Sequence, residues 1–175
     1  MTEPSPVPGD AFRSLVSRWA TGVSVVTARD GDRDSGLTVN ALTSVSLQPP
    51  TLLISLTHDA DTTPVVLRTR RFVVNVLAAG QRHLSERFAQ TLPGPEKFKG
   101  LPIHRRGDGP ARLDGSLAIF ECEVVETHAS ADHQLLIGRV VDLEAGPDGA
   151  PLLFYRSRYG EPTGPDSLHL PAGRR

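Results

Sequence analysis

Gly36-Leu-Thr-Val-Asn-Ala-Leu-Thr-Ser-Val-Ser-Leu47 is the stretch that decides the fold of this chain, and it ends just before Pro49-Pro50. Small hydroxyl and amide residues are interleaved in it with apolar residues. Interleaving of this kind is typical of β-strands that have one covered face. The stretch therefore predicts a strand, a loop and a second strand.

The segments on either side extend this β-rich pattern. Asp30-Gly31-Asp32 supplies turn residues, so a hairpin is expected there. Short apolar runs bounded by Gly, Pro or Asp predict further strands. These runs lie at residues 23–26, 52–56, 72–77, 117–125, 135–143 and 152–155.

Three short helices are expected between the strands. The first begins at Asp10, which can cap it, and Gly22 lies where it would stop. Its apolar residues fall at helical spacing and are Phe12, Leu15, Val16 and Trp19. A second helix is expected to begin at Pro64, and a third covers 84–89.

The order of these elements predicts a fold that is mainly β with short helices, in a closed antiparallel barrel and not a parallel sheet. Residues 10–160 are expected to form one domain, after a disordered lead at 1–9. The tail at 161–175 is expected to be flexible or laid over a neighbouring subunit. Residues 91–109 predict a long exposed loop, of the kind that often covers a site.

Composition excludes several classes of partner and site. A formal net charge of -1 gives no basic field for nucleic acid. Cys122 is the only cysteine, so no internal disulfide is possible, and no HxxxH or HExxH spacing suggests a metal site. No apolar run approaches a membrane span of about 18 residues. The N-terminus lacks the pattern of a signal peptide, so we expect a cytoplasmic protein.

Hydroxyl and amide side chains gather on two adjoining segments of the predicted barrel. They suit a ligand with imide edges, hydroxyls and a phosphate, although the same residues are common on the solvent face of ordinary strands. The residues are Thr38, Asn40, Thr43, Ser44, Ser46, Ser55 and Thr57.

Two further places suit a charged or planar ligand. The segment 57–64 joins a strand to a helix N-terminus, which favours an anion, but Asp59 and Asp61 would repel a phosphate and can instead serve as helix caps. His133 precedes an apolar strand, where it can touch a ligand or simply be an exposed loop residue. No GxGxxG or GxxxxGK[ST] motif is present, and Cys122 is expected to be a packing residue.

Eight segments, in this order, resemble the flavin reductase-like family with the FMN-binding split barrel, the reductase components of two-component flavin-dependent monooxygenases. They are Phe12-Arg-Ser-Leu with Ala20-Thr-Gly-Val-Ser-Val-Val-Thr27, the stretch 36–50, Phe72-Val-Val-Asn-Val-Leu77, Leu84-Ser-Glu-Arg-Phe-Ala89, Lys97-Phe-Lys-Gly100, Leu113-Asp-Gly-Ser-Leu-Ala118, Asp132-His-Gln-Leu-Leu-Ile-Gly-Arg-Val140 and Leu152-Leu-Phe-Tyr-Arg-Ser-Arg-Tyr159. The resemblance implies an antiparallel, Greek-key-like split barrel and a homodimer that builds its pockets from both subunits.

The resemblance also implies roles for individual residues. The flavin, FMN or FAD, would be held by Thr38, Val39, Asn40, Ala41, Ser44, Ser46, Ser55, Thr57, Asp61, Thr62, Thr63 and Phe88. The nicotinamide of NADH or NADPH would lie beside His133, with Tyr155, Arg158 and Tyr159 closing the pocket. Family members often place a basic residue near His58 or Asp61, and this sequence does not, so backbone amides or Arg87 would have to supply the charge.

The activity implied is NAD(P)H-dependent flavin reduction, with reduced flavin diffusing to a partner monooxygenase. Hydride transfer between two stacked rings depends mainly on orientation, so no catalytic acid or base is expected. A non-catalytic FMN-binding carrier or sensor is the alternative on the same fold. A structural or interaction domain that binds no flavin is a second alternative.

Overall fold

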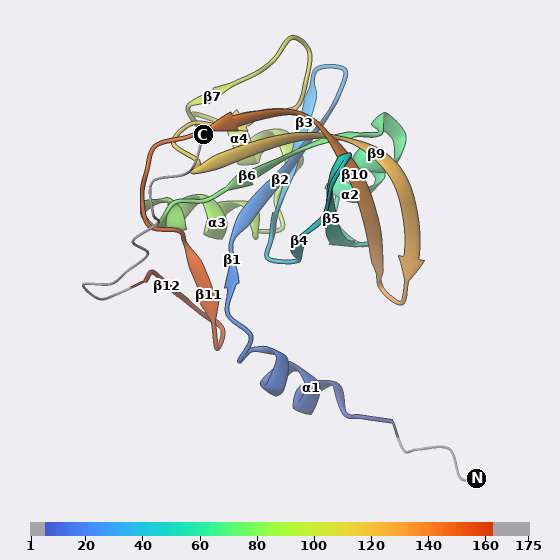
Figure 1. Ribbon diagram of the computed structural model, residues 1–175, viewed down its shortest axis with the longest axis vertical. Coiled ribbons are helices and arrows are strands. Elements are labelled where there is room, and N and C mark those ends of the chain that lie inside the picture. Colours follow the sequence, from blue (N-terminus) through green and yellow to red (C-terminus); the bar gives the residue numbers. More distant parts are fainter. Residues whose placement is uncertain (1–5, 163–175) are drawn as a thin grey trace.

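The structure is a computed structural model that describes residues 6–162, and antiparallel strands are its main elements (Figure 1). The strands are β1 (Thr21–Gly22), β2 (Ser24–Asp30), β3 (Arg33–Val39), β4 (Leu42–Leu47), β5 (Pro50–Thr57), β6 (Arg71–Val76), β7 (Ile103–His104), β8 (Arg112–Leu113), β9 (Ala118–Ser130), β10 (His133–Ala145), β11 (Leu153–Tyr155) and β12 (Arg158–Gly160). The helices are α1 (Gly9–Val16), α2 (Thr62–Thr69), the 3-10 helix η1 (Ala79–Gln81), α3 (Arg82–Phe88) and α4 (Gly94–Phe98).

Seven strands form the main sheet, in the order β3-β2-β6-β9-β10-β5-β4. Its two edge strands, β3 and β4, are consecutive in the chain and are joined only by Asn40 and Ala41. In a flat sheet these edges would be about 29 Å apart at a strand spacing of about 4.8 Å, whereas the link reaches at most about 11 Å. The sheet must therefore roll up until its edges meet. Within residues 6–162 no ladder joins β3 to β4, so the barrel is split and not closed as the order of the elements predicted. The mainly β, antiparallel split barrel that the resemblance implies is confirmed.

Apolar side chains pack on both faces of the rolled sheet. Val26 and Ala28 of β2 point into the barrel, where they join a buried cluster that includes Ile54 of β5 and Phe72 of β6. Val25, the residue before Val26, points outward and packs in a second cluster with residues of α3 and α4. Both faces of this part of the sheet are therefore covered.

Close backbone packing fixes two of the aromatic side chains. A Cβ on Gly36 would lie 2.6 Å from Cε1 of Phe88, and one on Gly138 would lie 2.5 Å from Cζ of Phe72. Only glycine therefore lets these rings lie against the sheet. Phe98 of α4 meets the Phe88 ring edge-on, with their centroids 5.0 Å apart.

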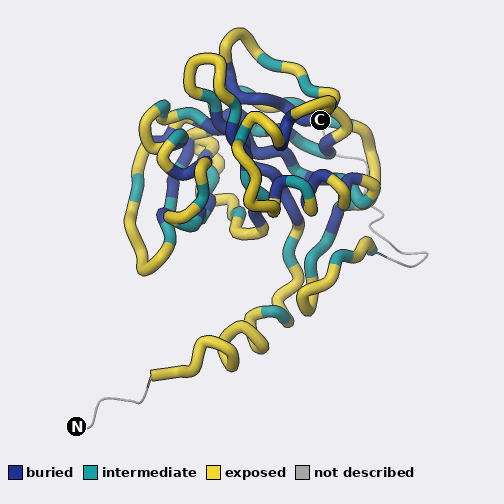
Figure 2. The backbone as a smooth tube through the Cα atoms, turned by 180° about the vertical axis from the view of Figure 1, so that it is seen from behind, coloured by how far each residue is buried: buried dark blue, intermediate teal, exposed yellow. Residues whose placement is uncertain are grey.

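The structure corrects three of the predicted elements. Helix α1 ends at Val16 instead of reaching Gly22, because Thr21 and Gly22 pair with β11 as a strand. Its residues have no covered face: Figure 2 shows α1 projecting from the barrel, almost entirely exposed. The segment 91–109 is also not a wholly exposed loop, because it contains α4, whose Lys97 and Phe98 are buried. Helix α2 begins at Thr62, two residues before the predicted start at Pro64.

The other predicted strands and the hairpin at Gly31 are confirmed by the ladders of the sheet. The predicted disordered lead at 1–9 lies outside the described residues for 1–5, and α1 already begins at Gly9. The predicted tail at 161–175 lies outside them from 163 onward. The domain bounds at 10 and 160 stay a prediction.

Candidate ligand-binding site

A cavity of about 590 Å³ opens where the link between β3 and β4 faces the end of α1. We call it the strand-link cavity. Its lining is mostly apolar and consists of Val16, Trp19, Ala20, Thr21, Gly22, Val23, Ser24, Asn40, Ala41, Leu42, Thr43, Leu53 and Val76. The Thr21 hydroxyl in this wall is buried and has no hydrogen-bond partner among the described residues. An apolar cleft with a few polar groups is the usual form of a small-molecule site.

A row of polar side chains continues from this cavity along one face of the barrel. Thr43 of β4 lies opposite Leu53 of β5, and Leu53, Ser55 and Thr57 share one face because alternate residues of a strand do. Thr57 lies directly opposite His133 of β10. The structure therefore brings residues from β4, β5 and β10 onto one continuous surface, which we call the polar face.

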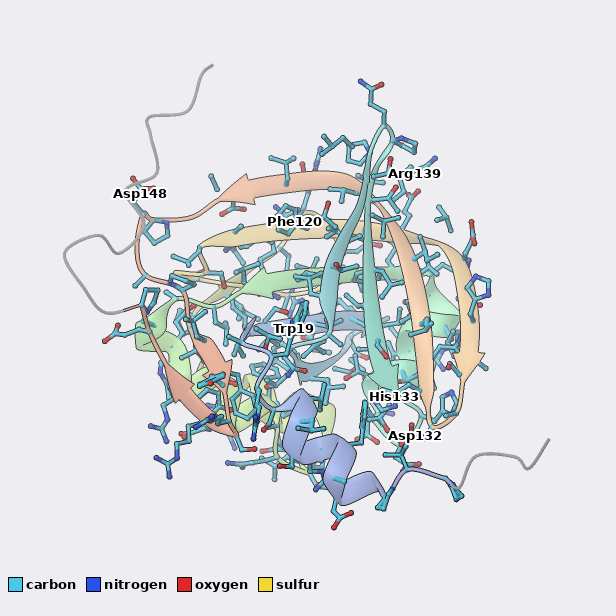
Figure 3. The ribbon with its side chains drawn as sticks, turned by 60° about the horizontal axis from the view of Figure 1, so that its bottom comes forward. Trp19, Phe120, Asp132, His133, Arg139 and Asp148 are labelled. Carbon is cyan, nitrogen blue, oxygen red and sulfur yellow. The ribbon has the colours of Figure 1, made fainter. Side chains whose placement is uncertain are left out.

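His133 lies at the end of the polar face with a defined ring orientation. Its Nδ1 is 2.7 Å from Oδ1 of Asp132, so Nδ1–H donates to the carboxylate and Nε2 is left for a ligand. This hydrogen bond lowers the pKa of Asp132. Figure 3 shows His133 and Asp132 at one end of β10, while Trp19 lies farther along the same open side of the molecule.

The N-terminus of α2 follows the end of the polar face. Thr62 and Thr63 are both buried, and the Thr63 hydroxyl donates to the carbonyl oxygen of Thr57 at 2.6 Å. Asp61 precedes the helix but makes no side-chain capping bond. The capping alternative for Asp61 is therefore not seen, and its carboxylate stays exposed beside the first turn.

Lys97 is the residue that reasoning from the sequence missed. Its side chain is 7% exposed, and Nζ donates to the carbonyl oxygens of Gly36 and Phe88, each at 3.2 Å. Burial lowers the pKa of Lys97, while the negative charge of Asp61 acts in the opposite direction. A buried cation thus lies within electrostatic reach of the α2 N-terminus. The segment Lys97-Phe-Lys-Gly100, which belongs to the family resemblance, was the one signal that could have pointed to it.

Arg87 does not have the role that was considered for it. Its guanidinium donates to the carbonyl oxygens of Glu96 at 3.0 Å and Lys99 at 2.6 Å. These bonds tie α3 to the end of α4. The Arg87 side chain is therefore committed to holding this segment together.

Several residues expected to hold the flavin present less surface than predicted. Phe88 is fully buried, Val39 points into the barrel core, and the Thr38 hydroxyl donates to the carbonyl oxygen of Ser85 at 2.6 Å. Ser44 lies opposite Leu52, which faces the core, so it occupies the other side of β4 from Thr43. A bulge follows Ser44.

The remaining hydroxyl groups of the predicted flavin-binding set differ in whether they already make a hydrogen bond within the protein. Ser46 accepts a hydrogen bond from the backbone N–H of Gln48 at 3.1 Å. Ser55 and Thr57, both half-buried, make no side-chain hydrogen bond within residues 6–162. The two hydroxyls nearest His133 are therefore available to a ligand.

Tyr155 and Arg158 line a different cavity from the one that Asn40 lines. This hairpin cavity, of about 700 Å³, is bounded by Ala20, Leu153, Tyr155, Arg156, Arg158, Tyr159, Gly160 and Glu161. His133 is not among its lining residues. The three residues predicted to contact nicotinamide are therefore divided between the polar face and the hairpin cavity.

The remaining chemistry-bearing groups are structural. Cys122 is buried, and burial raises the pKa of its thiol to about 12, so it is a packing residue as expected. No cluster of three metal-ligating side chains occurs among residues 6–162. Of the helices in this range, none has the length and apolar character needed to cross a bilayer.

Known proteins resemble this chain in both sequence and fold. The family described as "Flavin reductase like domain" matches residues 16–163. The reductase component of 4-nitrophenol 4-monooxygenase/4-nitrocatechol 2-monooxygenase from Rhodococcus opacus is 36% identical over 149 residues, which cover 85% of this chain and 78% of that protein. An NADH-dependent flavin reductase from Rhodococcus sp is 36% identical over 151 residues, covering 85% of this chain and 83% of that protein.

A solved structure has the same fold. It is the NADH:FAD oxidoreductase SgcE6 of Streptomyces globisporus C-1027, in complex with NAD and FAD fragments, at a TM-score of 0.84 and 28% identity, covering 94% of this chain and all of that one (100%). The class of protein is thus defined by a split antiparallel barrel that has an apolar cleft beside the link between its edge strands β3 and β4. This chain belongs to the flavin reductase-like domain family.

Proposed function

We propose that this chain is an NAD(P)H-dependent flavin reductase that transfers hydride from the nicotinamide to FMN or FAD. The observation that carries the proposal is the continuous surface from the strand-link cavity, along Ser55 and Thr57, to His133. It combines an apolar cleft with hydroxyl donors and an oriented imidazole on rigid strands. The related proteins named above are reductases of this kind.

The residues present fit a flavin. The strand-link cavity falls within the usual range for small-molecule sites, about 300–1,000 Å³, and its apolar walls suit a tricyclic ring. Its buried Thr21 hydroxyl lacks a partner within residues 6–162, so it has a free bond to offer. A bound flavin supplies the hydride acceptor, and the protein supplies position.

Each part of the surface has a role in binding. Asn40 and Ala41 border the ring, while Ser55 and Thr57 hydrogen-bond the polar side chain that runs toward α2. Asp61, Thr62 and Thr63 surround the phosphate, at the start of α2, where the helix dipole favours an anion. Lys97 offsets the negative potential of Asp61 at this point.

Five residues of the predicted flavin-binding set contribute to the site less directly: Thr38, Val39, Ser44, Ser46 and Phe88. Thr38, Val39 and Phe88 fix the position of β3, because their side chains are engaged in the core or on α3. Ser44 and Ser46 lie on the exposed edge strand β4, where a phosphate or a second subunit can reach them.

His133 holds the nicotinamide against the flavin through Nε2, with Asp132 fixing the ring. Tyr155, Arg158 and Tyr159 hold the rest of the donor. None of these side chains has to move a proton, because hydride passes directly between two rings held in contact. Exclusion of water and orientation are the catalytic devices.

The active form is a cytoplasmic homodimer with one domain at residues 10–160. Phe12, Leu15 and Trp19 are 63%, 62% and 75% exposed, and a second copy that covers α1 would also close the strand-link cavity. Reduced flavin then diffuses to a flavin-dependent monooxygenase. Light scattering tests the assembly: a monomer at micromolar concentration contradicts it.

Stopped-flow oxidation of NADH and NADPH with FMN, FAD and riboflavin tests the activity. Turnover of an added flavin is expected. The alternative, a carrier or sensor that binds FMN without reducing it, predicts tight binding and no NADH consumption. Absence of flavin binding would contradict both and favour a structural domain.

A further inference from the structure

We propose that Ala131 is a positioning residue that weakens binding of the nicotinamide donor, because it strains the turn from which His133 is presented. The inference rests on the proposed function, since it concerns the side chain that holds the nicotinamide. Ala131 does not touch the donor and acts only through its neighbours Asp132 and His133. The experiments below therefore measure donor binding and the state of the imidazole separately.

The turn between β9 and β10 consists of two residues, Ala131 and Asp132. Ala131 has a φ of 50°, whereas the φ of Asp132 is not positive. A positive φ at the first position alone is the pattern of a type II′ turn, in which that position is ordinarily glycine. The methyl group of alanine disfavours a positive φ, so the turn is strained at Ala131.

A second turn of the chain shows the same pattern without the strain. Strands β2 and β3 are joined by Gly31 and Asp32, and Gly31 has a φ of 59°. Each turn thus has a positive φ at its first residue and an aspartate at its second, but the first residue is glycine in one and alanine in the other. A Cβ on Gly31 would meet no atom within 4 Å. Backbone conformation, and not space, therefore distinguishes the two residues.

The contacts that hold the strained turn are also the contacts that orient His133. The carbonyl oxygen of Asp132 accepts a hydrogen bond from the backbone N–H of His58 at 2.9 Å. The Asp132 carboxylate is 2.7 Å from Nδ1 of His133. His133 itself pairs with Ser130 across the turn and with Thr57 on β5. The conformation of the turn and the orientation of the imidazole are therefore coupled.

The tip of this turn has little packing to hold it in the strained conformation. Ala131 is exposed, and the side chains of Asp132 and His133 are 85% and 44% exposed. Figure 3 shows Asp132 and His133 together at the end of β10. A strained residue persists only as far as its surroundings fix it, so in a fraction of the free molecules the turn relaxes and Asp132 releases the imidazole. A donor that needs the oriented ring then binds more weakly in proportion to that fraction.

Steady-state kinetics of Ala131→Gly test the proposal. Glycine adopts the same turn without strain, so KM for NADH is expected to fall about fivefold at unchanged kcat, and KM for FMN should not change. Gly31→Ala is the matched control, because it introduces the same strain in the β2–β3 turn, away from the polar face. This control should lower Tm by about 2 °C and leave both KM values unchanged. An unchanged or raised KM for NADH in Ala131→Gly would overturn the proposal, whatever happens to Tm.

Nuclear magnetic resonance of the imidazole separates this proposal from the proposed function, because it needs no turnover. The ring ¹⁵N shifts of His133, assigned by their loss in His133→Ala, report at alkaline pH which nitrogen carries the proton. Ala131→Gly is expected to increase the Nδ1–H form, which is the one that Asp132 holds. Equal shifts in Ala131→Gly and wild type would overturn the proposal. A wild-type protein that never oxidises NADH would overturn the proposed function, and an increased Nδ1–H form in the variant would still support the strained turn.

Discussion

The barrel has two sides, and they differ in how far their side chains are buried and hydrogen-bonded. On the covered side, beneath α3, α4 and residues 100–117, Asn75 is fully buried and bonded at both ends of its amide. On the open side, beside α1, Trp19 is 75% exposed, and the Ser55 and Thr57 hydroxyls make no hydrogen bond within residues 6–162. The covered side holds the fold together, whereas the open side keeps its apolar surface and its donors for partners.

This difference predicts that substitutions on the two sides change different measurements. A change on the covered side should lower the free energy of unfolding and leave the KM values of the remaining folded protein unchanged. A change on the polar face should alter KM at constant stability. The four predictions below use this division, from the largest expected effect to the smallest.

Asn75→Ala is expected to have the largest effect on stability. The amide donates to the carbonyl oxygen of Val25 at 3.0 Å and accepts from the N–H of Leu113 at 2.8 Å, and both partners would be left buried and unpaired. The expected cost is about 2–4 kcal/mol. Urea denaturation measures it. A loss below about 1 kcal/mol would mean that water replaces the amide and that this side is less sealed than its burial indicates.

His133→Ala is expected to raise KM for NADH about tenfold, or about 1.4 kcal/mol, because one oriented hydrogen bond to the donor is lost. FMN affinity and the unfolding free energy should be nearly unchanged, since the ring is exposed and bonds only to Asp132. His83→Ala is the control, because His83 is exposed on α3, on the covered side. Unchanged kinetics for His133→Ala would remove this residue from the site.

Much of this division could be predicted from the sequence because strands are encoded locally. The alternation of polar and apolar residues in 36–47 predicted β3 and β4. One of the hydroxyl residues in this stretch, Thr43, lines the strand-link cavity. The length of α1 could not be predicted, because it ends where Thr21 pairs with Phe154, more than a hundred residues away. That Thr43 and Ser44 lie on opposite faces follows from the alternation of a strand. Which of them faces the cavity could not be predicted, since it depends on pairing with β5.

The burial of Lys97 could not be predicted from the sequence, for a further reason. A lysine in a segment rich in charge and glycine is ordinarily solvated, and only the packing of α4 on β3 buries it. Its relation to the α2 N-terminus exists only in the folded chain, where the charge of Asp61 acts on Lys97. The sequence supplied the segment but not its burial.

Lys97→Met is expected to raise KM for FMN about fivefold, or about 1 kcal/mol, because the charge that offsets Asp61 near the phosphate is removed. KM for riboflavin, which has no phosphate, should not change. Lys99→Met is a matched control, since Lys99 is the only other lysine and is exposed. Equal effects on FMN and riboflavin would show that Lys97 supports β3 and not the phosphate.

His104→Gln is expected to have the smallest effect, and one that depends on pH. Nδ1 of His104 is 2.7 Å from Asp114 and Nε2 is 3.0 Å from Glu144, so both ring nitrogens donate only when the ring is protonated. These bonds, that to Asp114 first, raise the pKa of His104. The stabilisation is therefore complete below the unfolded value near 6.5 and disappears as the pH rises through the raised pKa of the folded chain.

The size of this effect is limited by solvent, because the His104 side chain is 43% exposed. A stabilisation below about 1 kcal/mol is expected, which corresponds to a Tm difference of at most about 3 °C for a chain of this length. Thermal unfolding of wild type and His104→Gln should therefore differ at pH 6 and converge above pH 9. A difference that grows with pH would mean that the neutral ring, and not the charged one, fastens β7 to β10 on the covered side.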